Sequence, residues 1–316
     1  MIEDPIDLFY LTGIELSAGQ LLISKEGSKL YVDGRYIEEA KSRTNAELGP
    51  AKLSGKVEFD SSKTTYQRYL DLQKEGVELI PVREPTRASR LIKTAEEMEK
   101  LVAAANLGVE GYYAVLELLK EGITEKEVAV ELEVFWRRKG GSSVAFSPII
   151  AFGESSSKPH YHPTDRPLRK NEAVLIDIGV TLDHYHSDMT RVYFFGKPHP
   201  KMEEIYEIVK EAQARALALC KPGVTCRELD LAARDFITEK GFGEFFAHGL
   251  GHGIGLQVHE PPRIHSKGSD ADFKLQAGMV ITVEPGIYLP SIGGIRIEDT
   301  VIITPNGHRN LTNCPK

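Results

Sequence analysis

The sequence predicts an α+β protein with a smaller amino-terminal α/β domain and a larger domain made of two similar halves. Two observations lead to this fold class. In the first ninety residues, short β-rich runs alternate with helical stretches, which is typical of α/β structure. Beyond them, a unit of helix, loop, helix and strands occurs twice, about a hundred residues apart.

The amino-terminal domain is predicted from runs of β-forming residues. Strands are expected at QLLIS (20–24), KLYVD (29–33), KVEFD (56–60) and VELIPV (77–82), and helices at residues 35–46 and 64–74. The segment REPTRASRLIK (83–93) contains proline, has no periodicity and carries a charge cluster, so it is the expected linker. We therefore expect two domains, residues 1–85 and 86–316.

Capping boxes, in which a threonine is followed three residues later by glutamate, predict the starts of three helices in the larger domain. The pairs are Thr94 with Glu97, Thr124 with Glu127, and Thr225 with Glu228. The first opens an amphipathic helix that is expected to end near residue 120.

The second and third of these helices match each other at an offset of 101 residues. The matched pairs are Gly122 and Gly223, Thr124 and Thr225, Glu127 and Glu228, Phe135 and Phe236, Lys139 and Lys240, and Gly140 and Gly241. We interpret the match as an internal duplication, the alternative being a chance likeness between two well-capped helices. Two halves create a cleft between them, where ligands from both can converge.

The composition excludes several classes of protein. Of 316 residues, 41% are hydrophobic and 27% charged, as in soluble globular proteins. No apolar run could span a membrane, and the start MIEDPIDLFY is unlike a secretory signal. Three cysteines without CxxC spacing suit a reducing compartment, and the net charge of −7 forms no basic stripe. We expect a cytoplasmic protein that binds neither nucleic acid nor membrane.

Four carboxylates in apolar surroundings indicate where the chemistry lies. Asp177 and Asp188 occupy two β-like runs of LIDIGVTLDHYHSDMT (175–190), which a turn separates, while Glu284 and Glu298 lie in two later apolar strands. Four such carboxylates cannot all be buried and ionised without countercharge. A divalent metal pair supplies that countercharge.

The segment HGLGHGIGLQVHE (248–260) supplies a further ligand in His252. Four carboxylates and one imidazole favour Mn²⁺, with Co²⁺, Fe²⁺ or Zn²⁺ as alternatives, and bridging carboxylates hold two ions about 3.5–4 Å apart. The glycines around His252 predict a sharp bend and a close backbone approach. A phosphate-binding loop is the rival interpretation, but the lysine and the serine or threonine of a P-loop are missing.

On these residues the chain resembles the pita-bread metallopeptidases, which include Xaa-Pro aminopeptidase, Xaa-Pro dipeptidase (prolidase), methionine aminopeptidase and creatinase. The resemblance covers nearly the whole chain and rests on LIDIGVTLDHYHSDMTRVY, HGLGHGIGLQVHE, TVEPGIY and GIRIEDTVIIT. It implies a pita-bread fold and five metal ligands, namely Asp177, Asp188, His252, Glu284 and Glu298. It further implies that Asp177 binds one ion and that Asp188 and Glu298 bridge both.

Residues that handle substrate are also implied by the resemblance. His160, in SKPHYHP, is similar to a histidine that lines the substrate cleft, and His259 to one that hydrogen-bonds the scissile carbonyl or the intermediate. His248 matches an outer histidine of the same loop. Arg296 resembles an arginine that orients outer groups, and Arg263 resembles a prolidase arginine that binds a dipeptide's carboxylate.

The amino-terminal domain resembles the family's smaller domain in DLFYLTGIELSAGQLLI and LYVDGRYIEEA. Methionine aminopeptidases generally lack this domain, which argues against their activity. The chain begins almost at YLTG, interpreted as a strand, so either the given start is a late one or the domain is shortened at its start. Relatives imply a homodimer.

The implied reaction is hydrolysis of the bond before proline in dipeptides or short proline-containing peptides. A water molecule activated by two metal ions attacks the carbonyl, with Glu284 as general base and then acid and His259 stabilising the oxyanion. Prolidase is slightly preferred over Xaa-Pro aminopeptidase. A creatinase-like amidinohydrolase and a non-enzymatic binding protein remain as alternatives, although the complete ligand set weighs against both.

Overall fold

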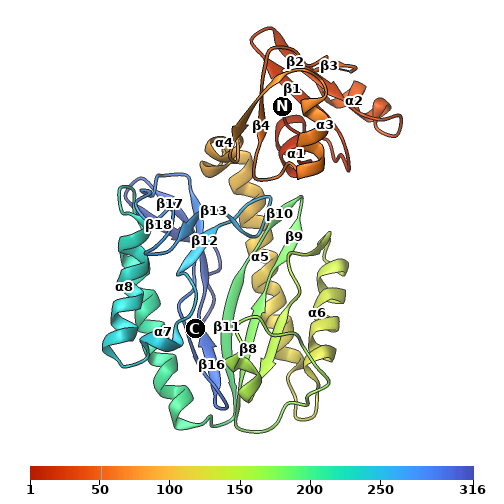
Figure 1. The fold of residues 1–316 in the computed structure, drawn as a ribbon. Helices are drawn as coiled ribbons and strands as arrows, with labels where there is room; N and C mark the ends of the chain where they lie inside the picture. Colours follow the sequence, from red (N-terminus) through yellow and green to blue (C-terminus); the bar gives the residue numbers. More distant parts are fainter. Residues whose placement is uncertain (51) are drawn as a thin grey trace. The chain divides into compact units, whose positions relative to one another are not determined.

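The computed structural model describes residues 1–50 and 52–316, which form two compact units, Met1–Ser89 and Arg90–Lys316 (Figure 1). The elements of the N-terminal unit are α1 (Pro5–Thr12), β1 (Gln20–Ser24), β2 (Gly27–Tyr31), α2 (Ile37–Arg43), β3 (Glu47–Leu48), β4 (Lys56–Asp60), α3 (Tyr66–Gln73) and β5 (Glu78–Val82). Strands β1 and β2 pair antiparallel, and β3 adds to β2 in parallel. Strands β4 and β5 form a second, parallel pair. The predicted α/β alternation is confirmed.

The prediction that YLTG forms a strand is wrong, because Tyr10, Leu11 and Thr12 belong to helix α1. Asp4 caps this helix by accepting hydrogen bonds from the N–H groups of Ile6 and Asp7. Pro5 occupies the first turn, where its missing N–H costs nothing. Gly13 ends the helix with a φ of 71°, a left-handed conformation that suits glycine. These cap signals outweigh the β-forming residues.

The segment predicted as a linker, residues 83–93, contains the short helix α4 (Arg87–Leu91). A helix of five residues is too short for periodicity to reveal it in the sequence. The division between the two compact units falls inside this helix, after Ser89. The domain boundary after residue 85 stays a prediction.

The C-terminal unit has two halves, each with two helices and a set of strands. The first half contains α5 (Ala95–Leu118), α6 (Glu125–Arg138), β6 (Ser143–Val144), β7 (Ile149–Phe152), the 3₁₀ helix η1 (Gly153–Ser157), β8 (Glu172–Ile178), β9 (Val180–Leu182), β10 (Tyr185–His186) and β11 (Met189–Phe195). The second contains α7 (Pro200–Leu219), α8 (Cys226–Glu239), η2 (Gly243–Phe245), β12 (Gly251–Gly253), β13 (Glu260–Ile264), β14 (Val280–Val283), β15 (Gly286–Leu289), β16 (Gly293–Arg296), β17 (Asp299–Thr304) and β18 (Gly307–Asn310). In Figure 1 the two helix pairs flank the strands.

The strands of this unit form several sheets. In the part of the chain that is described, the sheet orders are β11-β8-β7, β10-β9-β6, β13-β12-β14-β17-β18 and β15-β16. Sheet β11-β8-β7 belongs to the first half, and the sheet around β14 and β17 to the second. All of these pairings are antiparallel.

The predicted duplication is confirmed by matching backbone geometry. All three predicted capping boxes are formed, in α5, α6 and α8. Ahead of α6 and α8, Gly122 and Gly223 have φ values of 92° and 91°. The same loop bond occurs in both halves, since the N–H of Leu168 donates to Ile123 O and that of Leu275 to Val224 O, both at 2.8 Å.

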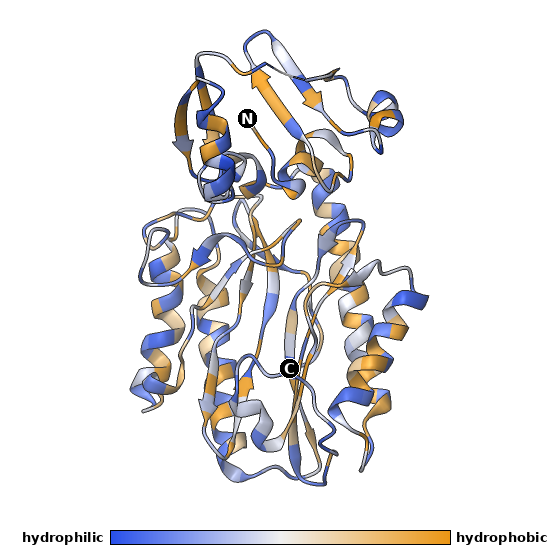
Figure 2. Ribbon diagram, turned by 45° about the vertical axis from the view of Figure 1, so that its right-hand side comes forward, coloured by the Kyte–Doolittle hydropathy of each residue, from blue (hydrophilic) through white to orange (hydrophobic). Residues whose placement is uncertain are grey.

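Two hydrophobic cores explain how the halves are held and which face of β8 meets the cleft. Val174, Ile176 and Ile178 pack with α5 and α6, whereas Ala173 and Leu175 pack with α7 and α8. Because side chains alternate along a strand, Asp177 points to the same side as Ala173 and Leu175, towards the second half. In Figure 2, hydrophobic residues (orange) alternate with hydrophilic ones (blue) along the strands and helices.

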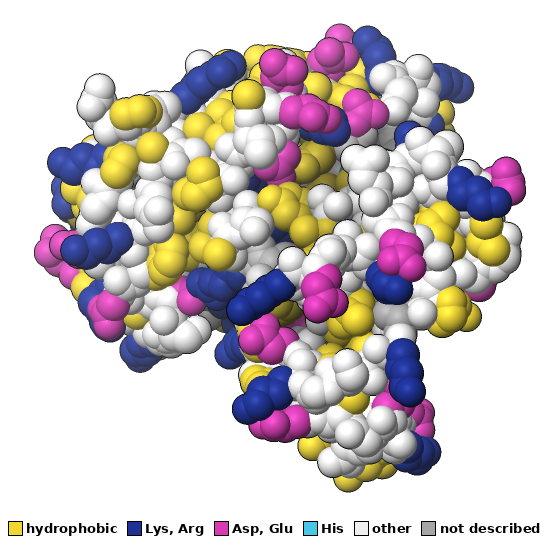
Figure 3. All heavy atoms as spheres, turned by 90° about the horizontal axis from the view of Figure 1, so that it is seen from above, with side chains coloured by type: hydrophobic (Ala, Val, Ile, Leu, Met, Phe, Trp, Pro, Cys, Tyr) yellow, Lys and Arg dark blue, Asp and Glu magenta, His cyan; other side chains and the backbone are white. Residues whose placement is uncertain are grey.

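The surface and helices add two general observations. On the face drawn in Figure 3, acidic and basic side chains are intermixed. Across residues 1–50 and 52–316, none of the helices combines the length and the apolar character that crossing a membrane requires.

Candidate metal centre

Asp177 and Asp188 come together because β8 and β11 pair antiparallel. Asp177 lies in β8 opposite Thr190, and Asp188 immediately precedes β11, whose first residue is opposite Ile178. The chain between the two carboxylates forms the hairpin of β9 and β10. Its turn contains Asp183 and His184, which have positive φ values of 46° and 69°.

Glu284 and Glu298 lie beside strands, and the prediction that each lies within one is wrong in this detail. Glu284 directly follows β14. Glu298 lies between β16, which pairs with β15, and β17, which pairs with β14. The chain therefore changes sheets at Glu298, which forms an isolated bridge with Thr190. A strand end frees the side chain from the regular alternation of the sheet and lets it reach a site between sheets.

His252 lies in β12, where glycines allow close packing of the backbone. A Cβ atom at Gly251 would lie 2.1 Å from Thr282 O, and one at Gly253 would lie 2.1 Å from Pro261 O. The pairing of β12 with β13 shifts register between His252 and Gly253. The predicted bend and close approach are thus present, and they turn the imidazole towards the carboxylates.

Three of the five predicted ligands form a cluster. One ligand atom from each of Asp188, His252 and Glu298 lies within 4.8 Å of the others. Glu284 joins through His252, whose Nε2 lies 3.3 Å from Glu284 Oε1 and 3.6 Å from Asp188 Oδ2. Asp177 instead forms an ion pair with Arg296 through Oδ2.

The pKa values in the cluster show an excess of negative charge. Burial, reinforced by neighbouring carboxylates, raises the pKa values of Asp188 and Glu298 well above their usual range. Burial also raises the pKa of Asp177. Burial acts in the same sense on Glu284, but its hydrogen bond with His252 and the nearby positive charges hold its pKa at about 2. The pKa of His252 rises to about 9 despite burial, because Glu284 and Asp188 favour its protonated form.

These residues fit a divalent metal site. The Oδ1 atom of Asp177 is buried and has no hydrogen-bond partner within the described part of the chain, which leaves a carboxylate oxygen available for a cation. Four carboxylates and one imidazole are donors that suit hard or borderline divalent ions. A bound cation favours the ionised forms of Asp188 and Glu298, which offsets both the burial and the repulsion between carboxylates that raise their pKa values.

Arg296 is the centre of a buried network that the sequence did not reveal. Besides Asp177, its guanidinium donates to Tyr288 Oη at 2.8 Å and to Thr190 Oγ1 at 3.1 Å. Thr190 in turn donates to Glu298 Oε2 at 2.8 Å. Arg296 therefore orients two predicted ligands, Asp177 directly and Glu298 through Thr190. Tyr288 and Thr190 follow Glu284 and Asp188 by only a few residues. This closeness in sequence to predicted ligands is the one signal that could have pointed to them.

The network fixes the tautomer of His248. Because Gly249 O can only accept, His248 Nδ1 carries the proton and donates to it at 2.8 Å. The Nε2 atom of the neutral ring then accepts from Tyr288 Oη, which lies 2.8 Å away. Burial lowers the pKa of His248, which agrees with a neutral ring. His248 is thus linked through Tyr288 to Arg296, which pairs with Asp177.

The remaining predicted substrate residues lie near His252 and His259. The rings of His252 and His259 meet edge to face, with centroids 4.3 Å apart. Burial lowers the pKa of His259, and charges on His252, His160 and Arg263 lower it further. His160 and Arg263 are both exposed and near enough to act on His259. Arg263 lies in β13, opposite His252.

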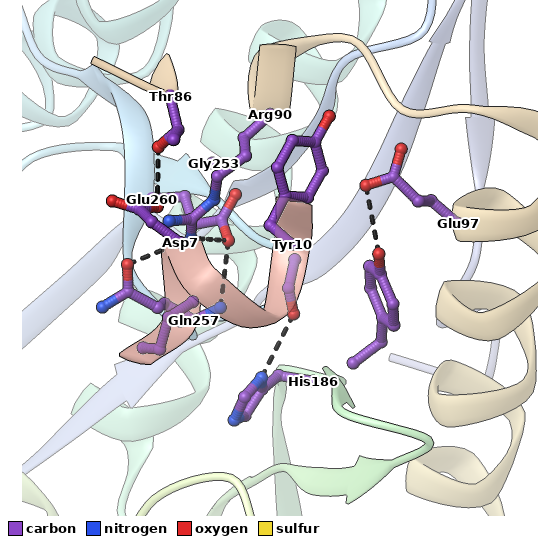
Figure 4. Close-up of polar contacts among 12 residues, drawn as sticks. Asp7, Tyr10, Thr86, Arg90, Glu97, His186, Gly253, Gln257 and Glu260 are labelled. Carbon is purple, nitrogen blue, oxygen red and sulfur yellow. Dashed lines mark hydrogen bonds and ion pairs between the residues drawn. The ribbon is translucent and has the colours of Figure 1, made fainter. Parts of the chain in front are cut away.

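A buried ion cluster holds the loop that carries His259. The Glu260 carboxylate forms ion pairs with Arg90 Nη2 at 2.5 Å and with Lys93 Nζ at 3.3 Å. Arg90 also donates a hydrogen bond to Gln257 (Figure 4). The N–H of His186 donates to Gly255 O at 3.0 Å. These contacts tie both ends of the loop, so His259 is presented from a rigid support.

Two family models match the chain. One, described as metallopeptidase family M24, matches residues 99–305, and the other, the creatinase/prolidase N-terminal domain, matches residues 1–92.

Relatives match over nearly the full length. An Xaa-Pro dipeptidase from Pyrococcus furiosus is 38% identical over 328 residues, covering 100% of this chain and 93% of the relative. The solved prolidase from Pyrococcus horikoshii OT3 superposes with a TM-score of 0.94 at 38% identity, over 99% of this chain and 93% of that one. The X-Pro aminopeptidase from Thermotoga maritima MSB8 gives a TM-score of 0.89 at 35% identity, over 98% and 92% of the two chains.

Proposed function

Because the chain belongs to metallopeptidase family M24, we propose that it is a metallo-exopeptidase that hydrolyses Xaa-Pro dipeptides, as a prolidase does. The observation that carries the proposal is the full-length likeness to an Xaa-Pro dipeptidase, 38% identical over 100% of this chain. The site supports it, since carboxylates and an imidazole from both halves converge, and the ring of His259 packs against that imidazole.

Asp177, Asp188, His252, Glu284 and Glu298 are the proposed ligands of two divalent ions, and Mn²⁺ is the metal that we propose. When bound, the ions supply Lewis-acid activation of water and of the scissile carbonyl. The predicted homodimer and cytoplasmic location stay predictions from the sequence.

Glu284 is the proposed general base. Its carboxylate lies 3.3 Å from His252 Nε2 at the centre of the cluster, where it would accept the proton of the attacking water and return it to the leaving nitrogen. The lowered pKa of His259 keeps that ring neutral at neutral pH, and a neutral imidazole still donates one hydrogen bond to a developing oxyanion.

Proline suits such a site because its imide nitrogen has no hydrogen to donate to the enzyme. In a dipeptide the proline also carries the terminal carboxylate, for which Arg263 is the proposed partner. Arg263 lies opposite His252 in the β12–β13 pair, and the His252 ring contacts that of His259.

Xaa-Pro aminopeptidase activity on longer peptides is the second candidate. The likeness to the X-Pro aminopeptidase from Thermotoga maritima, 35% identical over 98% of this chain, favours it. The two activities differ in whether a carboxylate or a continuing chain follows proline, so substrate length discriminates between them.

Comparing Ala-Pro with Ala-Pro-Ala and Arg-Pro-Pro, with Mn²⁺ added, tests the proposal. We expect a kcat/KM for Ala-Pro at least about tenfold above those of the longer peptides, because only the dipeptide offers a carboxylate to Arg263.

The Arg263→Met variant should raise KM for Ala-Pro roughly tenfold, whereas Arg309→Met, at an exposed arginine of β18, should not. Faster cleavage of the longer peptides would instead establish the aminopeptidase.

A further inference from the structure

We infer that Glu125 is a positioning residue, whose buried carboxylate ties down residues 152–164 and so places His160 in the substrate site. The inference rests on the proposed function, because His160 acts on substrate only in that proposal. It names a residue that the sequence patterns did not single out. Glu125 is the first residue of α6 and is fully buried.

The carboxylate of Glu125 binds one segment at both ends. Among the described residues, Oε1 accepts from the N–H of Phe152 at 2.9 Å, while Oε2 accepts from Tyr161 Oη at 2.8 Å. Oε2 also accepts from the N–H of Thr164 at 3.0 Å and from its hydroxyl at 2.8 Å. A buried carboxylate is tolerated where donors satisfy it, and these donors do so.

The cap of the helix does not require this carboxylate. Thr124 and Glu127 already form the capping box of α6, with Glu127 Oε2 accepting from the N–H of Thr124 at 2.8 Å. A negative charge in the first turn also favours the helix dipole, but the exposed Glu127 supplies such a charge. The specific contribution of Glu125 is therefore its attachment to residues 152–164.

The duplication provides an internal comparison. At the 101-residue offset, Glu125 corresponds to Cys226 in α8. Both helix starts receive the same backbone ties, since the N–H of Glu125 donates to Arg166 O and that of Cys226 to Phe273 O. A thiol is only a weak acceptor and cannot replace a carboxylate that accepts several hydrogen bonds. The half that presents His160 thus adds an attachment that the shared fold does not need.

Tyr161 transmits this attachment to His160, its neighbour in the chain. The Tyr161 ring packs against the hydrophobic core that strands of the first half share with α7 and α8, while its hydroxyl is held by Glu125. At the other end of the segment, Ser156 Oγ accepts from the N–H of Gly294 at 2.8 Å, close in sequence to Arg296. His160 itself stays exposed.

Hydrogen exchange of the metal-loaded protein tests the attachment itself. In Glu125→Gln, the amide group can no longer accept from all of these donors, so peptides covering residues 152–164 should exchange roughly tenfold faster. Peptides from β8 should not change. Glu127→Gln is the matched control, because it alters a glutamate in the same turn without touching the segment. Unchanged exchange in Glu125→Gln would overturn the inference.

A double-mutant cycle tests whether Glu125 acts through His160. With Ala-Pro as substrate, Glu125→Gln should lower kcat/KM roughly 10- to 100-fold in the wild-type background, because misplaced binding groups cost that much. In the His160→Ala background the same change should cost about twofold or less, since coupled residues are not additive. Equal losses in both backgrounds would show a general structural role and overturn the inference.

Tyr161→Phe repeats both tests if Glu125→Gln fails to fold, since it removes one hydroxyl and leaves the carboxylate three other donors. We expect the same direction of change in exchange and in the cycle, and no change in either would reject the inference. If the wild type does not cleave Ala-Pro, the proposed function fails, but hydrogen exchange still tests the attachment.

Discussion

Replacing Glu284 by glutamine is expected to lower kcat for Ala-Pro hydrolysis by about a thousandfold or more. General acid–base catalysis contributes roughly 10²–10⁴-fold, and Glu284 is in addition a proposed metal ligand. Its carboxylate lies 3.3 Å from His252 and has a pKa of about 2, so the wild-type protein always holds an ionised base at neutral pH. Glutamine cannot accept a proton at this position. Initial rates with saturating Mn²⁺ measure the effect.

Glu244→Gln is the control for this experiment, because Glu244 is an exposed glutamate of η2. It should keep the wild-type kcat. The KM of Glu284→Gln should change less than its kcat, since a group that transfers protons acts mainly in the transition state. A Glu284→Gln enzyme with kcat within tenfold of wild type would remove Glu284 from the catalytic role.

Replacing Asp188 by asparagine should abolish detectable hydrolysis and yet stabilise the metal-free protein at neutral pH. With metal, the variant loses one of the carboxylates proposed to bridge the ions. Without metal, Asp188 is a buried carboxylate whose pKa is raised well above its usual range by burial and by neighbours that include Asp177. Ionising it in the folded state therefore opposes folding, and asparagine removes this cost.

The sign of the pH dependence follows from the direction of the shift. A carboxyl group whose pKa is raised in the folded protein does not lower the free energy of unfolding at pH values below its unfolded pKa of about 3.9. The free energy of unfolding then falls as the pH rises from that value through the folded pKa. The advantage of Asp188→Asn over wild type, measured by thermal unfolding in chelator, should therefore be absent near pH 4 and grow towards pH 8. Adding Mn²⁺ should stabilise wild type more than the variant.

Asp230→Asn is a matched control of opposite sign. Asp230 is fully buried like Asp188, but its pKa is lowered, because bonds with Arg234 and Ser266 outweigh the effect of burial. Removing its charge should destabilise the metal-free protein at neutral pH, by an amount that shrinks as pH falls below about 4. If both variants shift the melting temperature in the same direction, crowding of negative charge is not what distinguishes Asp188.

The sequence predicted elements whose signals are local. Capping boxes located α5, α6 and α8 because a threonine and a glutamate three residues apart act within one turn. Short helices were missed where caps and packing decide the structure, as in α1 and α4. There the residues themselves, such as Phe9 and Tyr10, also favour strands.

For the site, the sequence indicated which residues carry the chemistry but not how they are held. Asp188, His252 and Glu298 gather as a cluster, although they are far apart in the chain. The pairing of Asp177 with Arg296, and the link from Thr190 to Glu298, depend on contacts between different sheets. No periodicity within a single segment encodes such contacts, so only the folded arrangement reveals them.

Metal stoichiometry tests the central claim most directly, namely that charges from both halves form one site for two divalent ions. The protein is stripped with chelator, reconstituted with Mn²⁺, freed of excess metal and measured by elemental analysis. We expect about two equivalents per chain for wild type and for Glu244→Gln, and fewer for Asp188→Asn. Wild-type protein that retains no manganese, cobalt, iron or zinc after reconstitution would contradict the account.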